Sequence, residues 1–206
     1  FLTNFIFSFE KNWTIYKKKI NKTKKKIISF EYQWLFKQAY FVNKKKTWKI
    51  KAKSGGGLIN YYLPHAIFNI VNIYKNVKFK RIGRKIIYNR NPIYLELIFS
   101  LNREKSKLII SNKSNENKHL LNTNFNQNNL LLENNTRKWL SNFKIFLDGK
   151  KIFTQKKIVQ KDSRLNTLVN IYSNLKFYFS KNYVARNKFL TYKTFKIIKH
   201  INTKLK

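Results

Sequence analysis

The chain has no cysteine and no methionine, and its 206 residues include only five glycines, two prolines and eight acids. Without cysteine the protein can form neither a disulfide nor a thiolate metal site, which fits a reducing compartment. No uninterrupted apolar run approaches the roughly 18 residues that a bilayer-spanning helix needs. The sequence therefore predicts no membrane span, no disulfide framework and no cysteine-based metal centre.

The few ionisable groups that catalysis normally uses are scattered along the chain. The eight acids are Glu10, Glu31, Glu96, Glu104, Glu116, Glu133, Asp148 and Asp162. No two of them stand at a spacing typical of a metal pair or an acid/base couple. The three histidines, His65, His119 and His200, are isolated and are expected to be satisfied surface residues. We therefore expect a protein that is not an enzyme, with no catalytic residues, no metal and no cofactor.

Positive charge dominates what is present. The chain has 45 lysines and arginines and a formal net charge of +37, spread along its whole length. A compact fold with that charge would repel itself, so a polyanionic partner is indicated, and nucleic acid is the natural one. Lys, Asn, Ile, Phe and Tyr, all of which have codons made only of A and T, are abundant. This bias favours an organelle genome.

The first 57 residues combine lysine triplets with aromatic residues and show no clean period. Trp13, Tyr16, Trp34, Phe36 and Trp48 lie between the basic runs. Such alternation favours contact, because lysines pair with phosphates while rings stack on bases or on protein. A solvated arm is the alternative interpretation. The glycine triplet at 55–57 lacks the Lys-Ser/Thr of a phosphate-binding loop and is interpreted as a hinge.

The middle of the chain is more regular. Residues 63–74 have helical spacing, with Pro64 in a tolerated first-turn position, and residues 78–88 resemble a strand. Residues 93–101 alternate like a strand, but Asn91-Pro92 resembles a helix cap and first turn, so a second helix is predicted. Residues 111–136 are rich in Asn, Ser and Lys, which is typical of a loop or insertion.

The second half is predicted to be mostly β. Asp148-Gly149 lies between two alternating runs and predicts a hairpin over 143–159. The sum is an α+β fold of two small modules, an α/β half and a mostly antiparallel β half, behind a basic extension. The predicted units are a basic aromatic-rich extension at 1–57, an α/β module at 58–111, an Asn-rich insertion at 112–138 and a mostly β module with its tail at 139–206.

The order of features from residue 64 onward resembles the small-subunit ribosomal protein eight family. The matching segments are a helix tip at 70–76, a basic strand at 84–89 and a Pro-led helix at 92–104, followed by the hairpin at 143–159 and residues 158–164. The family's Ser-Thr-Ser-Lys-Gly loop is reduced here to Phe179-Ser180-Lys181-Asn182. The match covers about two-thirds of the chain, and neither the extension nor the Asn-rich insertion has a counterpart in the family.

The resemblance implies a structural constituent of an organelle ribosome that binds small-subunit ribosomal RNA and stabilises its folded geometry. It implies no small-molecule substrate, and the extension would contact neighbouring ribosomal proteins. The RNA-binding residues that it implies are Arg81, Arg84, Lys85, Arg90, Lys157, Lys161, Arg164, Ser180, Lys181, Asn182 and Arg186. Lysines would act as point charges on phosphates, and arginines would make directional hydrogen bonds.

Several alternatives stay open at this point. The protein could be another organelle ribosomal protein, of the large-subunit six or small-subunit four type. It could also be a basic accessory subunit of an organelle membrane complex, because lysine-rich arms bind anionic lipid surfaces. The expected location is the mitochondrial matrix, with the plastid as the alternative.

Overall fold

The computed structural model describes residues 10–23, 25–38, 54–136, 142–154 and 165–205. One mixed sheet of eight strands, in the order β2-β3-β4-β1-β5-β6-β7-β8, forms its centre. The strands are β1 (Ile27–Lys37), β2 (Val77–Tyr88), β3 (Asn91–Leu101), β4 (Glu104–Ser111), β5 (Lys113–Phe125), β6 (Asn129–Asn134), β7 (Lys144–Leu147) and β8 (Lys150–Thr154). β1 pairs with β4 in parallel, and every other pairing is antiparallel.

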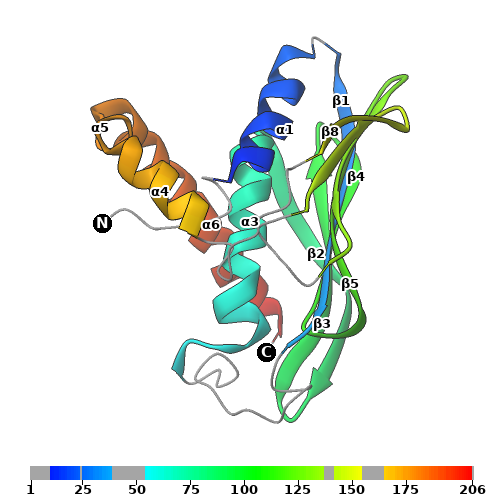
Figure 1. The fold of residues 1–206 in the computed structure, drawn as a ribbon. Coiled ribbons are helices and arrows are strands. Elements are labelled where there is room, and N and C mark those ends of the chain that lie inside the picture. Colours follow the sequence, from blue (N-terminus) through cyan, green and yellow to red (C-terminus); the bar gives the residue numbers. More distant parts are fainter. Residues whose placement is uncertain (1–9, 24, 39–53, 137–141, 155–164, 206) are drawn as a thin grey trace.

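The described helices lie on one side of this sheet (Figure 1). They are α1 (Lys11–Lys22), the π-helix η4 (Leu58–Tyr62), α3 (Leu63–Ile73), α4 (Leu165–Ser173), α5 (Leu175–Tyr178) and α6 (Lys181–Leu205). α1 and α3 pack on the sheet, whereas α4 and α5 lie farther from it, beside the first half of α6 (Figure 1). None of the described helices is long and apolar enough to cross a membrane.

The core lies between the sheet and the helices, and β1 shows how the sequence builds it. Phe30, Tyr32, Trp34 and Phe36 alternate along this central strand and are all buried. Alternation with period two places them on the one face that the helices cover. The aromatic residues of the first 57 that the structure describes are therefore core residues and do not form a nucleic-acid contact surface. Trp48 lies outside the described residues.

Helix α1 is fixed to the sheet by one buried hydroxyl. The Tyr16 hydroxyl lies 2.7 Å from Thr123 Oγ1 and 2.8 Å from the Leu130 carbonyl oxygen, and Thr123 Oγ1 is 2.6 Å from the Tyr74 hydroxyl. This network connects α1, β5, β6 and the end of α3. Buried hydroxyls need such partners, because leaving one unsatisfied costs about 1–3 kcal/mol.

Several predictions for single segments are confirmed. The helix expected at 63–74 is α3, with Pro64 in its first turn, and the strand expected at 78–88 is β2. The hairpin predicted over 143–159 contains β7 and β8, with Asp148 and Gly149 both at positive φ in its turn, and residues 155–159 lie outside the described residues. The Asp148 carboxylate also accepts a hydrogen bond of 2.8 Å from the Asn129 backbone N–H, which fixes this turn to β6.

Three other predictions are wrong. Residues 91–101 form β3 and not a helix, because Asn89 and Arg90 adopt positive φ and close a tight hairpin with β2. The segment expected to be a loop at 111–136 forms β5 and β6, whose buried Leu121 and Leu132 face the core. The end of the chain, expected to be mostly β, forms α4, α5 and α6.

The α+β class is correct, and its sheet is one continuous layer in the described residues. Residues 11–37 of the predicted extension supply α1 and the central strand β1.

Candidate functional site

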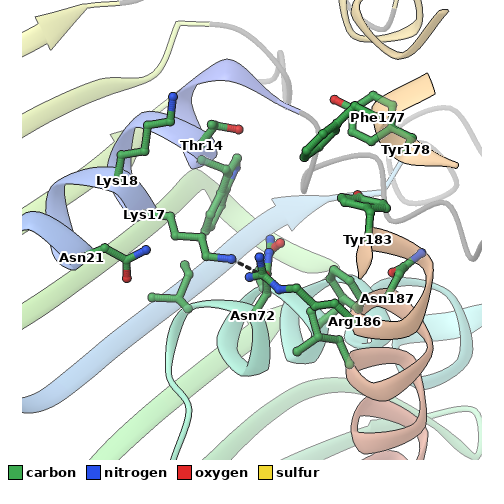
Figure 2. Close-up of a pocket in the computed structure, with 15 residues that line it drawn as sticks. Thr14, Lys17, Lys18, Asn21, Asn72, Phe177, Tyr178, Tyr183, Arg186 and Asn187 are labelled. Carbon is green, nitrogen blue, oxygen red and sulfur yellow. Dashed lines mark hydrogen bonds between the residues drawn. The ribbon is translucent and has the colours of Figure 1, made fainter. Parts of the chain in front are cut away.

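A pocket of about 310 Å³ opens between α1, α3, α5 and α6, on the helical side of the sheet (Figure 2). Trp13 and Lys17 face it from α1, where a spacing of four residues places them on one side of the helix. Asn72 faces it from the end of α3, and Tyr183 and Arg186 face it from the first turns of α6. Three helices that are distant in sequence therefore converge on one volume.

Two cations meet a single neutral acceptor in this pocket. Lys17 Nζ donates a hydrogen bond of 2.5 Å to Asn72 Oδ1, and Arg186 Nη2 donates one of 2.9 Å to the same oxygen (Figure 2). The described residues that line the pocket include no aspartate or glutamate. The positive charge of Lys17 and Arg186 is therefore left without a counter-ion from these residues.

The electrostatics of Lys17 reflect this arrangement. Burial, and to a smaller extent the nearby positive charge of Arg186, together lower the pKa of Lys17 to about 8. An anion placed between the two cations would remove that repulsion and favour the charged amine. The pocket can thus bind an anionic group, and its lysine can release or take up a proton close to neutral pH.

Aromatic rings form the wall of the pocket opposite Lys17. The rings of Phe177, Tyr178 and Tyr183 contact one another, with centroids 5.1–5.4 Å apart. Burial, followed by the neighbouring Tyr178, raises the pKa of Tyr183 to about 12, so its hydroxyl is neutral at physiological pH. Phe177 is 60% exposed, so much of its ring is open to solvent at the pocket. A planar group can stack there at little cost.

Glu10, which directly precedes α1, is the one acid that is buried among the residues the structure describes. Glu10 is 3% exposed and accepts hydrogen bonds from Asn12 Nδ2 at 2.7 Å and from Thr167 Oγ1 at 3.3 Å. Burial raises the pKa of this carboxyl, against the opposing effect of its hydrogen bonds. Glu10 fixes the start of α1 to α4 and so supports the position of Lys17.

His200 is exposed, as expected, whereas His65 and His119 differ from the expectation of surface residues. His119 is fully enclosed in the core, its ring stacked on Tyr32 and Trp34 with centroids 5.6 and 4.9 Å away, and Nε2 lies 2.7 Å from the Tyr32 hydroxyl. Burial lowers its pKa to about 3, and burial likewise lowers the pKa of His65 to about 4. The described residues contain no group of three or more His, Asp or Glu side chains that could hold a metal ion.

The structure separates most of the residues expected to bind RNA. Arg81, Arg84 and Lys85 lie on β2 and Arg90 lies in the turn that follows it, all exposed at one end of the strand order. Ser180, Lys181, Asn182 and Arg186 lie at the start of α6, and only Arg186 of these lines the pocket. Lys157, Lys161 and Arg164 lie outside the described residues. RNA binding by this set stays a prediction.

Sequence reasoning missed Lys17 and Asn72 as site residues. Lys17 belongs to a lysine triplet, and Asn72 lies on the polar side of the predicted helix. Neither pattern indicates that the Lys17 amine would contact the side-chain amide of Asn72, which lies 55 positions later in the chain. Only the packing of α1 and α6 against α3 brings them together.

No protein-family model and no curated protein matches the sequence. Solved structures do match in fold. An oxidoreductase from Thermotoga maritima superimposes with a TM-score of 0.68 at 14% identity, over 96% of this chain and 58% of its own. A 3-ketoreductase from Actinomadura kijaniata, solved with NADP and TDP-benzene, gives 0.67 at 9% identity, over 98% of this chain and 61% of its own.

The transcriptional regulator Gal80p from Kluyveromyces lactis shares the fold as well. It matches with a TM-score of 0.62 at 13% identity, over 85% of this chain and 50% of its own. The chain thus spans about half to three-fifths of the length of these proteins. At such low identity, the likeness establishes the fold.

These matches correct the functional expectations from the sequence. The resemblance to ribosomal protein eight is wrong, because the fold is that of dehydrogenases, ketoreductases and Gal80p. The same matches overturn the ribosomal role and its partners, small-subunit RNA and neighbouring ribosomal proteins. They also overturn the two alternatives, another organelle ribosomal protein and an accessory subunit of an organelle membrane complex. The expectations of a non-enzyme and of no small-molecule substrate fail on the same finding.

The physical reasons for this error are specific. The resemblance to ribosomal protein eight required a helix at residues 92–104, but this segment forms β3 and the turn after it. The expectation of an RNA partner rested on the net charge, which indicates the charge of a partner and does not determine the fold.

Proposed function

We propose that this chain is the sheet-containing part of an oxidoreductase-type protein and that it binds a nucleotide in the pocket between α1, α3 and α6. One observation carries the proposal: Lys17 and Arg186 converge on the neutral Asn72 amide, beside an open aromatic wall. The ligand's phosphate would lie against the two cations, and its ring system against the tyrosines.

Phosphate fits the cationic pair for electrostatic and geometric reasons. A guanidinium offers paired N–H donors to phosphate oxygens, and an ammonium acts as a compact point charge. Both groups already have their side chains ordered by Asn72, so less conformational entropy is lost on binding. A phosphate would also supply the negative charge that the pocket's described residues lack.

The aromatic wall fits the remainder of a nucleotide. Bases and nicotinamide rings are planar, and stacking of a base on an aromatic side chain contributes about 1–3 kcal/mol. Phe177, Tyr178 and Tyr183 provide such faces within the same pocket. The 3-ketoreductase of similar fold was solved with NADP and TDP-benzene, and both ligands contain phosphate. This supports the ligand class.

The test is a binding titration in moderate salt, where loose polyanion binding to a +37 protein is weakened. Intrinsic fluorescence, to which Trp13 in the pocket contributes, would follow additions of NADP⁺ and of TDP. Thymidine and nicotinamide riboside, which lack the phosphates under test, serve as ligand controls. We expect saturable binding of a phosphate-bearing nucleotide and weak binding of the nucleosides.

Variants locate the binding. We expect Arg186→Gln and Lys17→Gln each to weaken nucleotide binding about tenfold, the loss expected for a hydrogen bond to a charged group. Lys188→Gln removes one charge from an exposed position of α6 that does not line the pocket and should bind as the parent does. Equal losses in all three variants would mean that net charge alone attracts the ligand, and the proposal would fail.

A mitochondrial location, which the organelle-like composition favours, also remains a proposal.

A further inference from the structure

A second hollow, separate from the nucleotide pocket, lies between the outer side of α6 and strand β2. Its volume is about 660 Å³, within the roughly 300–1,000 Å³ of small-molecule sites. Val77 and Phe79 of β2 form one wall, and Phe189 and Tyr192 of α6 form the other. The hollow is therefore a groove with two apolar sides, and we name it the α6–β2 groove.

The α6–β2 groove exposes apolar rings that a folded protein normally covers. Phe189 is 63% exposed and Tyr192 is 68% exposed, and they lie one helical turn apart on α6. Two lysines of α6 also donate hydrogen bonds to backbone carbonyls at or near β2. Lys193 Nζ donates to the Lys75 carbonyl at 2.8 Å, and Lys204 Nζ donates to the Lys80 carbonyl at 3.2 Å.

Cations surround the apolar walls. Lys78, Lys196 and Lys199 line the groove, and among the described residues none of the three has a hydrogen-bond or ion-pair partner. No acidic residue lines the groove, and none occurs anywhere between Leu165 and Leu205. The groove thus presents apolar surface and uncompensated positive charge side by side.

We propose that the α6–β2 groove binds an anionic amphiphile, a long-chain carboxylate, with its alkyl chain between the two apolar walls and its head group among the three lysines. Burial of the chain supplies the apolar contribution, at roughly 25 cal/mol per Å² removed from water. The carboxylate supplies the missing negative charge. This inference is independent of nucleotide binding.

The other classes of occupant fit the groove less well. A second copy of the chain would bring like charges together, because the face of α6 that contains Lys196 and Lys199 has no acid to oppose them. A helix that lies on a bilayer surface keeps its cationic side chains on the face opposite its apolar ones. Here Lys196 and Lys199 line the same groove as Phe189 and Tyr192.

The test uses the full chain and dodecanoate below its micelle concentration, followed by calorimetry. We expect one saturable site for dodecanoate and binding at least roughly tenfold weaker for dodecanol, which has the chain without the charge. Octanoate should bind more weakly than dodecanoate, because each buried methylene contributes about 0.8 kcal/mol. Equal binding of dodecanol and dodecanoate would overturn the proposal.

Paired variants assign the site. Lys196→Gln with Lys199→Gln should weaken dodecanoate binding roughly tenfold, and Tyr192→Ser should weaken it through lost apolar contact. The matched control is Lys150→Gln with Lys151→Gln, which removes the same charge from exposed positions on β8, at the opposite end of the strand order. Loss of binding in the control pair, or binding only to anionic phospholipid vesicles and not to monomeric dodecanoate, would contradict the proposal.

Discussion

At the scale of single residues, two buried ionisable groups oppose each other in their effect on stability. His119 is held neutral in an aromatic stack, because burial disfavours its charged form. Glu10 is also buried, and burial raises the pKa of its carboxyl and so favours its protonated form. As the pH falls, the burial of His119 therefore lowers the stability of the folded chain, whereas the burial of Glu10 raises it.

His119 makes the folded chain less stable as the pH falls. Its pKa is about 3 in the folded chain, against about 6.5 for an unperturbed histidine, so the unfolded chain binds more protons between those values. Stability contributed by the neutral ring is present above pH 6.5 and is lost as the pH falls toward 3. Urea unfolding should show a loss of about 2 kcal/mol from this group between pH 7 and pH 5.

The comparison with His119→Gln isolates that group. This variant should lose much less stability between the two pH values, since Gln does not titrate, while Glu10 is unchanged. His200→Gln makes the same substitution at an exposed position and is the matched control. Parallel pH profiles for parent and His119→Gln would contradict the assignment.

At the scale of elements, α6 depends on its buried stripe. Leu190, Ile198 and Ile201 are buried on this helix, whereas Phe195, between them in sequence, is 51% exposed. The spacing is that of one helical face. α6 also presents Arg186 to the nucleotide pocket, so its packing against α3 positions half of the cationic pair.

Truncating a side chain to alanine should cost more stability on the buried face of α6 than on its exposed face. Ile201→Ala should lower the free energy of unfolding by about 2–4 kcal/mol, because it leaves a cavity in the core. Phe195→Ala should change it by less than about 0.5 kcal/mol. Chemical denaturation measures both values, and a larger loss for Phe195→Ala would show that the outer face of α6 is covered in the folded protein.

The elements also show what the sequence could and could not reveal. The α3 helix, β2 and the Asp148-Gly149 hairpin were predictable, because their signals are local: spacing, a first-turn proline and a turn dipeptide. The start of β3 was not, because Asn91-Pro92 suits both a helix cap and a strand, and only pairing with β2 and β4 decides. The polar composition of 113–125 hid β5, whose inward residues include Thr123 and His119.

The candidate site was even less accessible from sequence. Arg186 was named as a binding residue, but for a different ligand, and no other described residue of that predicted set lines the pocket. Lys17 meets Arg186 only through long-range packing of helices that local patterns do not specify.

At the scale of the whole molecule, the +37 charge acts on stability as well as on binding. Like charges repel in the compact state, and salt screens that repulsion over about 10 Å at 0.1 M. We therefore expect the midpoint of thermal unfolding to rise with added sodium chloride, by roughly 2–4 °C for each kcal/mol of repulsion screened. A scanning calorimetry series in salt measures this, and a midpoint that falls with salt would show that attractive ion pairs dominate instead.

The most direct test of the nucleotide pocket is the proton taken up on binding. At pH 8 about half of the Lys17 amines are uncharged, because the pKa is about 8. A phosphate beside Lys17 raises that pKa, so titration calorimetry of NADP⁺ in buffers of different ionisation enthalpy should show uptake of up to about half a proton. Lys17→Arg should keep the binding and lose the uptake, since arginine stays charged. Nucleotide binding without proton uptake in the parent, or the same uptake in Lys17→Arg, would contradict a site built on Lys17 and Arg186.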